Sequence, residues 1–105
     1  FKNKFVKATQ TQLNTQIYDV YDKLTYLKNR KSIRWEYKFI ARGDDYELEM
    51  ISIIFQVMID NLAYTFSVSA PTIFYNKNPQ FFNTIFNGIH FMPDKTKLDK
   101  ILIGE

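Results

Sequence analysis

The sequence predicts an α+β fold in which an antiparallel meander sheet of about four strands is flanked by an N-terminal and a C-terminal helix. At the start of the chain, apolar residues recur at every fourth position, which is typical of a helix. From Ile33 onward they alternate with polar residues, which is typical of half-buried strands. Short turn signals separate the alternating segments, and a second helical pattern follows them.

The first predicted element is a helix over Lys2–Gln16. Phe5, Thr9, Leu13 and Ile17 follow one another in steps of four and would line one side of it. The next is a strand over Tyr18–Leu27, joined to its neighbour by a loop formed by residues 28–31. That loop predicts the pairs Tyr26–Ile33, Leu24–Trp35 and Val20–Phe39, and it turns Asp22 inward opposite Tyr37.

The second strand begins at Ile33 and ends before Gly43-Asp44, which reads as a two-residue hairpin turn. This turn predicts opposite charges on one face and apolar pairs on the other. The predicted pairs are Arg42–Asp45, Lys38–Glu49, Phe39–Leu48 and Tyr37–Met50.

The third strand, about Asp45–Ile59, changes its apolar positions from even to odd numbers near Met50. Either a bulge lies between Met50 and Ser52, or both faces of the sheet are covered there. Asp60-Asn61 is a further turn signal, and it predicts that Phe55 pairs with Phe66 and Val57 with Tyr64 in a fourth strand. Pro71 ends this strand because it has no amide hydrogen.

A second helix is predicted from Asn78 as cap and Pro79 as first residue to Gly88 as C-terminal stop. Beyond Pro93 the chain is polar and lysine-rich, with a final amphipathic turn around Leu98 and Ile101.

Composition narrows the function classes. The 105 residues suit one domain, 1–105, and the start at Phe1 suggests a fragment or a processed part of a longer protein. There is no Cys, which excludes disulfides, zinc–thiolate sites and thiol nucleophiles, and no apolar run long enough for a membrane helix. A net charge of +3 indicates an ordinary mixed surface. No pattern predicts a cofactor or a metal.

The candidate catalytic and metal-binding residues each have a simpler structural explanation. His90 is the single histidine and has no Ser, Cys or acid around it in a recognisable frame. The acidic residues Asp44, Asp45, Glu47 and Glu49 lack the spacing of a calcium loop. Arg42-Gly43-Asp44 reproduces the integrin-binding tripeptide, but the hairpin turn explains it. We therefore expect no catalytic residue.

The densest basic patch is the most specific candidate for binding. It consists of Lys28, Arg30, Lys31 and Arg34. Basic residues beside Trp35 are typical of proteins that bind single-stranded nucleic acid, through phosphates and stacking. Trp35, however, shares a strand face with Tyr37 and Phe39, which predicts that it points into the core. Nucleic-acid binding is therefore the alternative to binding a protein partner.

The end of the chain resembles the closing unit of PsbP-like domains, a superfamily that includes the DcrB-type bacterial lipoproteins and the Ran-binding Mog-type proteins. The resemblance lies in the alternation of aromatic and small polar residues over 64–70, followed by Phe81, Phe82, Ile85 and Phe86, and then by the final segment 88–91. It implies a sheet sandwiched between helices and a non-catalytic role. Family members carry extra strands before the first long helix, so their absence here would leave an open sheet edge at which a homo-oligomer can form.

Together these observations predict a non-enzymatic binding or assembly domain. The resemblance implies that it belongs to an exported bacterial surface protein or lipoprotein, with an extracellular or cell-surface location. Its expected partner is a protein.

Overall fold

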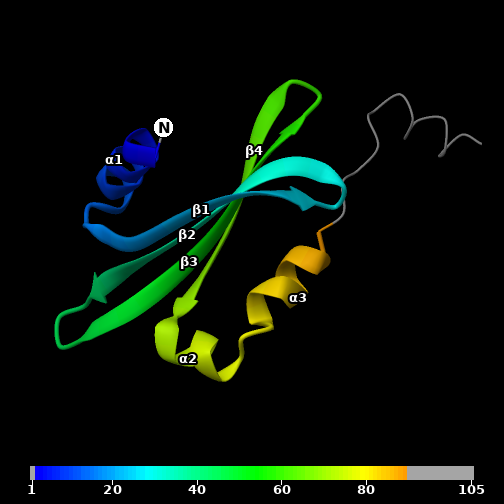
Figure 1. Cartoon of the computed structure of the whole chain (residues 1–105). Coiled ribbons are helices and arrows are strands. Elements are labelled where there is room, and N and C mark those ends of the chain that lie inside the picture. The colour runs from blue at the N-terminus through cyan, green and yellow to red at the C-terminus, as the bar shows by residue number, and fades with distance from the viewer. Residues whose placement is uncertain (1, 90–105) are drawn as a thin grey trace, which may run out of the picture.

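The computed structural model describes residues 2–89, and within them it has the predicted α+β fold, a four-stranded antiparallel sheet with flanking helices (Figure 1). The elements follow one another as α1 (Lys2–Leu13), β1 (Ile17–Leu27), β2 (Arg30–Arg42), β3 (Glu47–Ile59), β4 (Leu62–Pro71), α2 (Thr72–Lys77) and α3 (Phe81–Asn87). Each strand pairs with the next one along the chain, so the sheet is a meander in the order β1-β2-β3-β4.

One side of the sheet, here called the α1 face, packs against α1. Trp35 is fully buried there, and its ring stacks on Phe5 of α1 with centroids 3.8 Å apart and planes 8° apart. Tyr37, Ile54 and Ile17 complete the buried cluster on this face. Trp35 therefore points into the core, as its strand position predicts.

The other side, here called the α3 face, packs against α2 and α3. Ile51, Ile53 and Phe55 of β3 are buried against Phe82 and Phe86 of α3. The rings of Phe55 and Phe86 meet edge to face, with centroids 4.6 Å apart.

The change of parity in β3 follows from these two cores. The β2–β3 register runs without a break from the Ser32–Val57 pair to the Arg42–Glu47 pair, so no bulge interrupts β3. Instead, Ile54 is buried on the α1 face while Ile51 and Ile53 are buried on the α3 face. Of the two explanations open to the sequence, covering of both faces is the correct one.

The register between β3 and β4 is confirmed. Phe55 pairs with Phe66 and Val57 with Tyr64, and the ladder ends at Pro71. Asp60 and Asn61 adopt φ values of 51° and 66°, the left-handed pair that a two-residue hairpin turn requires.

The predicted register between β1 and β2 is wrong by two residues. The turn is Lys28-Asn29, with φ values of 49° and 67°, and Arg30 and Lys31 belong to β2. Consequently Ile33 pairs with Leu24, not Tyr26, and Trp35 with Asp22, not Leu24. A bulge between Tyr18 and Tyr21 then brings Ile17, not Val20, opposite Phe39. Asp22 lies opposite Trp35, not Tyr37, and it stays exposed at the sheet edge.

The predicted register between β2 and β3 is also wrong by two residues. Residues 43–46 form the connection, closed by a 2.9 Å hydrogen bond from the Gly43 amide to the Tyr46 carbonyl. The observed pairs are Arg42–Glu47, Phe39–Met50, Tyr37–Ser52 and Lys38–Ile51. A shift of two residues leaves every side chain on its predicted face, which is why the pattern did not reveal the error.

The helices differ from the prediction at their ends. α1 ends at Leu13, because Asn14 turns left-handed (φ 54°) and stops it before Gln16. The helix α2 was not predicted, and Asn78 and Pro79 lie in the connection after it, so α3 begins at Phe81 with Gln80 as its cap. Gly88 is the C-terminal cap, as predicted.

Candidate functional site

The predicted basic patch does not form a single surface. Lys28 lies in the β1–β2 turn, and Lys31, opposite Tyr26, projects on the α1 face. Arg30 and Arg34 project on the α3 face, where Arg34 forms a 3.5 Å ion pair with Glu36. Trp35 is buried under Phe5 and has no free face for a base. The structure therefore divides Arg30, Lys31 and Arg34 between two sides of the sheet and leaves Lys28 in the turn.

The acidic residues of the β2–β3 hairpin have structural partners or face solvent. Glu47 pairs with Arg42 at 3.0 Å, which also accounts for the arginine of the integrin-like tripeptide. Asp44 and Asp45 are exposed in the connection. Over residues 2–89, no three or more acids, histidines or cysteines are grouped so as to hold a metal ion.

Glu49 has a specific partner on the α3 face. It accepts a 2.5 Å hydrogen bond from the hydroxyl of Tyr18, and this bond raises the pKa of Tyr18 to about 12. The same bond lowers the pKa of the Glu49 carboxyl, with a smaller contribution from the Thr72 hydroxyl. The pair links the start of β1 to β3.

His90 and the predicted amphipathic turn near Leu98 lie outside the described residues. No helix in the described part of the chain is long and apolar enough to cross a membrane.

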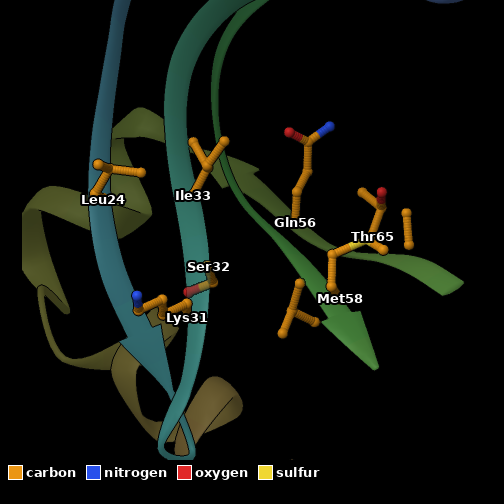
Figure 2. Close-up of a pocket in the computed structure, with 9 residues that line it drawn as sticks. Leu24, Lys31, Ser32, Ile33, Gln56, Met58 and Thr65 are labelled. Carbon is orange, nitrogen blue, oxygen red and sulfur yellow. The ribbon is translucent and has the colours of Figure 1, made fainter. Parts of the chain in front are cut away.

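A hollow that was not predicted lies on the α1 face, at the end of the sheet that carries the Lys28-Asn29 and Asp60-Asn61 turns. We call it the distal hollow; it encloses about 470 Å³. Its side chains come from all four strands, as Figure 2 shows for seven labelled residues. Nine residues line it, namely Leu24, Lys31, Ser32, Ile33, Gln56, Val57, Met58, Ala63 and Thr65.

Register explains why these side chains converge. Leu24 pairs with Ile33, Ile33 with Gln56, and Met58 with Ala63, so these five side chains project on the same face, whereas Ser32 and Val57 pair with each other and have the opposite parity. Leu24 of β1 is 81% exposed and Met58 of β3 is 58% exposed, so two large apolar side chains flank the hollow uncovered. The distal hollow is thus an apolar depression open to solvent.

Polar groups border the apolar floor and connect it to the core. Lys31, Gln56 and Thr65 supply an ammonium, an amide and a hydroxyl. The Gln56 Oε1 atom accepts a 2.8 Å hydrogen bond from the Trp35 indole Nε1. Gln56 therefore links the hollow to Trp35, the single tryptophan of the chain, through one hydrogen bond.

The hollow exists because the helix on this face is short. α1 has 12 residues and is about 18 Å long, whereas the 13 residues of β2 extend over about 43 Å. Phe5 docks on Trp35 at mid-strand, and the helix ends beside the other end of the sheet, where Leu13 approaches Phe39 and Ala41. The distal half of the face has no helix among the described residues.

Sequence reasoning missed this site because its pattern is that of a core. Leu24, Ile33 and Met58 occupy the same alternating positions as buried residues such as Trp35 and Ile54. Only the position and length of the covering helix distinguish the exposed half from the buried half.

Comparison of the chain with protein-family models, with curated proteins and with solved structures finds no match.

Proposed function

We propose that this chain is a non-enzymatic binding or assembly domain that binds a protein partner through the distal hollow. The observation that carries the proposal is the exposure of Leu24 and Met58 around an apolar depression that is lined from all four strands. Exposed apolar depressions with a polar border are typical of protein-binding sites.

The chemistry of the lining indicates what the partner presents. Leu24, Ile33 and Met58 suit one or two apolar side chains, and methionine adapts its shape to different partners. Lys31 and Gln56 at the border suit backbone carbonyls or a carboxylate beside the apolar anchor. An extended or helical peptide segment with an apolar anchor fits this combination.

The resemblance to PsbP-like domains supports the same class of function and suggests a location. Its members bind partners or support assemblies, and a helix-flanked antiparallel sheet is the architecture that the resemblance implies. We propose on this basis that the domain belongs to an exported bacterial surface protein or lipoprotein. An upstream signal peptide with a lipobox cysteine in the full reading frame would support the location, and an intracellular start just before Phe1 would contradict it.

The binding property of the hollow can be tested with a defined apolar probe. The dye 1-anilinonaphthalene-8-sulfonate should bind the native protein and quench Trp35 emission, because Gln56 joins the hollow to the indole. Leu24→Ser and Met58→Ser should each weaken dye binding about tenfold, whereas Tyr46→Ser, which removes an exposed aromatic at the opposite end of the sheet, should not. Equal dye binding by all three variants would refute the site.

Binding of a polypeptide needs a second experiment. A photo-cross-linking residue placed at Met58 should form a discrete adduct with members of a displayed peptide library that carry an apolar anchor. Adding Leu24→Ser should abolish the adduct, and the same photo-reactive residue at Tyr46 is the matched control. Adduct formation that is equal at both positions would exclude selective binding.

Nucleic-acid binding through the basic patch of Lys28, Arg30, Lys31 and Arg34 stays a prediction, and no contact among the described residues favours it. Retention on a polyanion column that falls with salt and disappears on charge reversal of Lys28 and Arg30 would support it.

A further inference from the structure

The two edges of the sheet differ in how they are protected. The edge strand β1 is interrupted by the bulge between Tyr18 and Tyr21, with Asp19 at φ 50°, and it carries Asp22 and Lys23. Bulges and charges of this kind prevent an edge from pairing with another chain.

The edge strand β4 has none of these features along its length. It runs over Leu62–Pro71, contains no charged residue, and pairs with β3 without a break from Ile59–Leu62 to Met50–Pro71. Its proline comes only at the last position. A regular, uncharged edge of ten residues is a template for a further strand.

From this asymmetry we infer that the chain forms a symmetric homodimer in which β4 pairs antiparallel with β4 of a second copy. The two-fold axis passes near Phe66, and the two four-stranded sheets become one continuous sheet. The inference rests on the β4 edge and not on the function proposed for the distal hollow, although Ala63 and Thr65 of β4 also line that hollow.

The side chains of β4 match themselves under this symmetry. An axis at Phe66 places Thr65 opposite the partner's Ser67 and Ala63 opposite the partner's Ser69, so small residues meet on the α1 face. On the α3 face, Tyr64 lies opposite the partner's Val68, an aromatic and β-branched pair that stabilises sheets. No charge opposes a like charge anywhere along the strand.

Exposed apolar residues at the two ends of β4 favour a second copy over an unrelated strand. Leu62 and Tyr64 lie at its start and project on the α3 face. Ile73 and Phe74 follow its end, in α2, which packs on the same face. All four side chains are between 41% and 65% exposed.

Antiparallel pairing brings the start of each β4 beside the end of the other. Leu62 and Tyr64 of one copy then lie next to α2 of the partner, where Ile73 and Phe74 remain uncovered in the monomer. The two-fold axis repeats this contact, so Leu62 and Tyr64 of each copy cover Ile73 and Phe74 of the other. An isologous interface has this reciprocal form. Figure 1 shows the start of β4 and α2 at opposite ends of the strand.

Sedimentation equilibrium over a range of protein concentrations tests the dimer. The unmodified chain should dimerise, and Ser67→Lys should weaken the dimer tenfold or more, because two ammonium groups meet near the axis. Ser67 is exposed, so the substitution leaves the core intact; far-ultraviolet circular dichroism and Trp35 emission check this. Tyr21→Lys, which places the same charge on the exposed β1 edge, is the matched control and should leave the dimer unchanged.

A second variant, Ile73→Ser, and hydrogen exchange test the dimer without relying on Ser67→Lys. Ile73→Ser should also weaken dimerisation, and the amides of β4 should exchange more slowly at dimeric than at monomeric concentrations. A monomer at all concentrations, or a dimer that dissociates with Tyr21→Lys but not with Ser67→Lys, would overturn the inference. A dimer sensitive to Ser67→Lys but not to Ile73→Ser would overturn the proposed contact with α2.

Discussion

Phe5 makes the aromatic contacts between α1 and the sheet, and its removal gives the most direct test of the packing. Phe5 stacks on Trp35 at a centroid distance of 3.8 Å and meets Tyr37 edge to face at 6.1 Å. We expect Phe5→Ala to lower the free energy of unfolding and to detach α1 from the sheet.

The magnitude follows from the burial of the ring. Replacing a fully buried Phe by Ala costs about 3–5 kcal/mol, and an aromatic pair contributes about 0.5–1.5 kcal/mol beyond its buried area. Because Phe5 is half-buried, we expect a loss of about 2–3 kcal/mol in the free energy of unfolding. An isolated helix of 12 residues is marginal in water, so α1 should also lose helical content when it is undocked.

Trp35 supplies the assay, since it is the single tryptophan of the chain and is fully buried under Phe5. Urea denaturation followed by Trp35 emission gives the change in stability. Under native conditions the emission of Phe5→Ala should shift to longer wavelength, and the ellipticity at 222 nm should decrease in magnitude. Lys4→Ala, at an exposed position of the same helix, is the matched control and should change neither.

A Phe5→Ala protein that matches the unmodified chain in stability and in emission would refute the reasoning. It would mean that α1 does not cover Trp35 in solution and that the α1 face is open over its whole length.

Three further predictions concern single side chains. The buried Ser32 hydroxyl has no hydrogen-bond partner within residues 2–89, so Ser32→Ala should raise the free energy of unfolding by about 1 kcal/mol in urea titrations; a loss of stability would contradict this. Because the folded pKa of Tyr18, about 12, lies above its ordinary value of 10.0, its contribution to stability is complete below pH 10 and is lost between pH 10 and 12. The difference in stability between the unmodified chain and Tyr18→Phe should therefore shrink over that interval, and a constant difference would exclude the effect. At the Lys28-Asn29 turn, Asn29→Ala should cost about 1 kcal/mol in thermal or urea unfolding and Asn29→Gly should cost nothing, since φ at this position is 67°; equal effects would argue against the turn type.

Local chemistry determined the strands and one of the three turns. Alternation alone located the strands, because a side-chain period of two is a property of the extended backbone. Asp60 and Asn61 tolerate positive φ, so the register of β3 with β4 followed from the sequence. Lys28 is not typical of left-handed backbone, so the sequence predicts a longer loop, residues 28–31, where the structure has a two-residue turn.

The tertiary structure decided the registers that alternation left open. A slip of two residues keeps each side chain on its face, so Phe39 projects on the α1 face whether it pairs with Leu48 or with Met50. The helix α2 also depends on the tertiary structure. Six residues form no stable helix alone, and Tyr75 stabilises this one by packing on the core.

The candidate site belongs wholly to this second category. The sequence determined that Leu24, Ile33 and Met58 are apolar and share a face, and it located the basic residues along β2. It did not determine which half of that face is covered, because coverage depends on where Phe5 docks and on a helix that is less than half as long as β2 beneath it. The free edge of β4 was likewise established only when all four strands had their places in the sheet, since an edge is a property of neighbours and not of the strand itself.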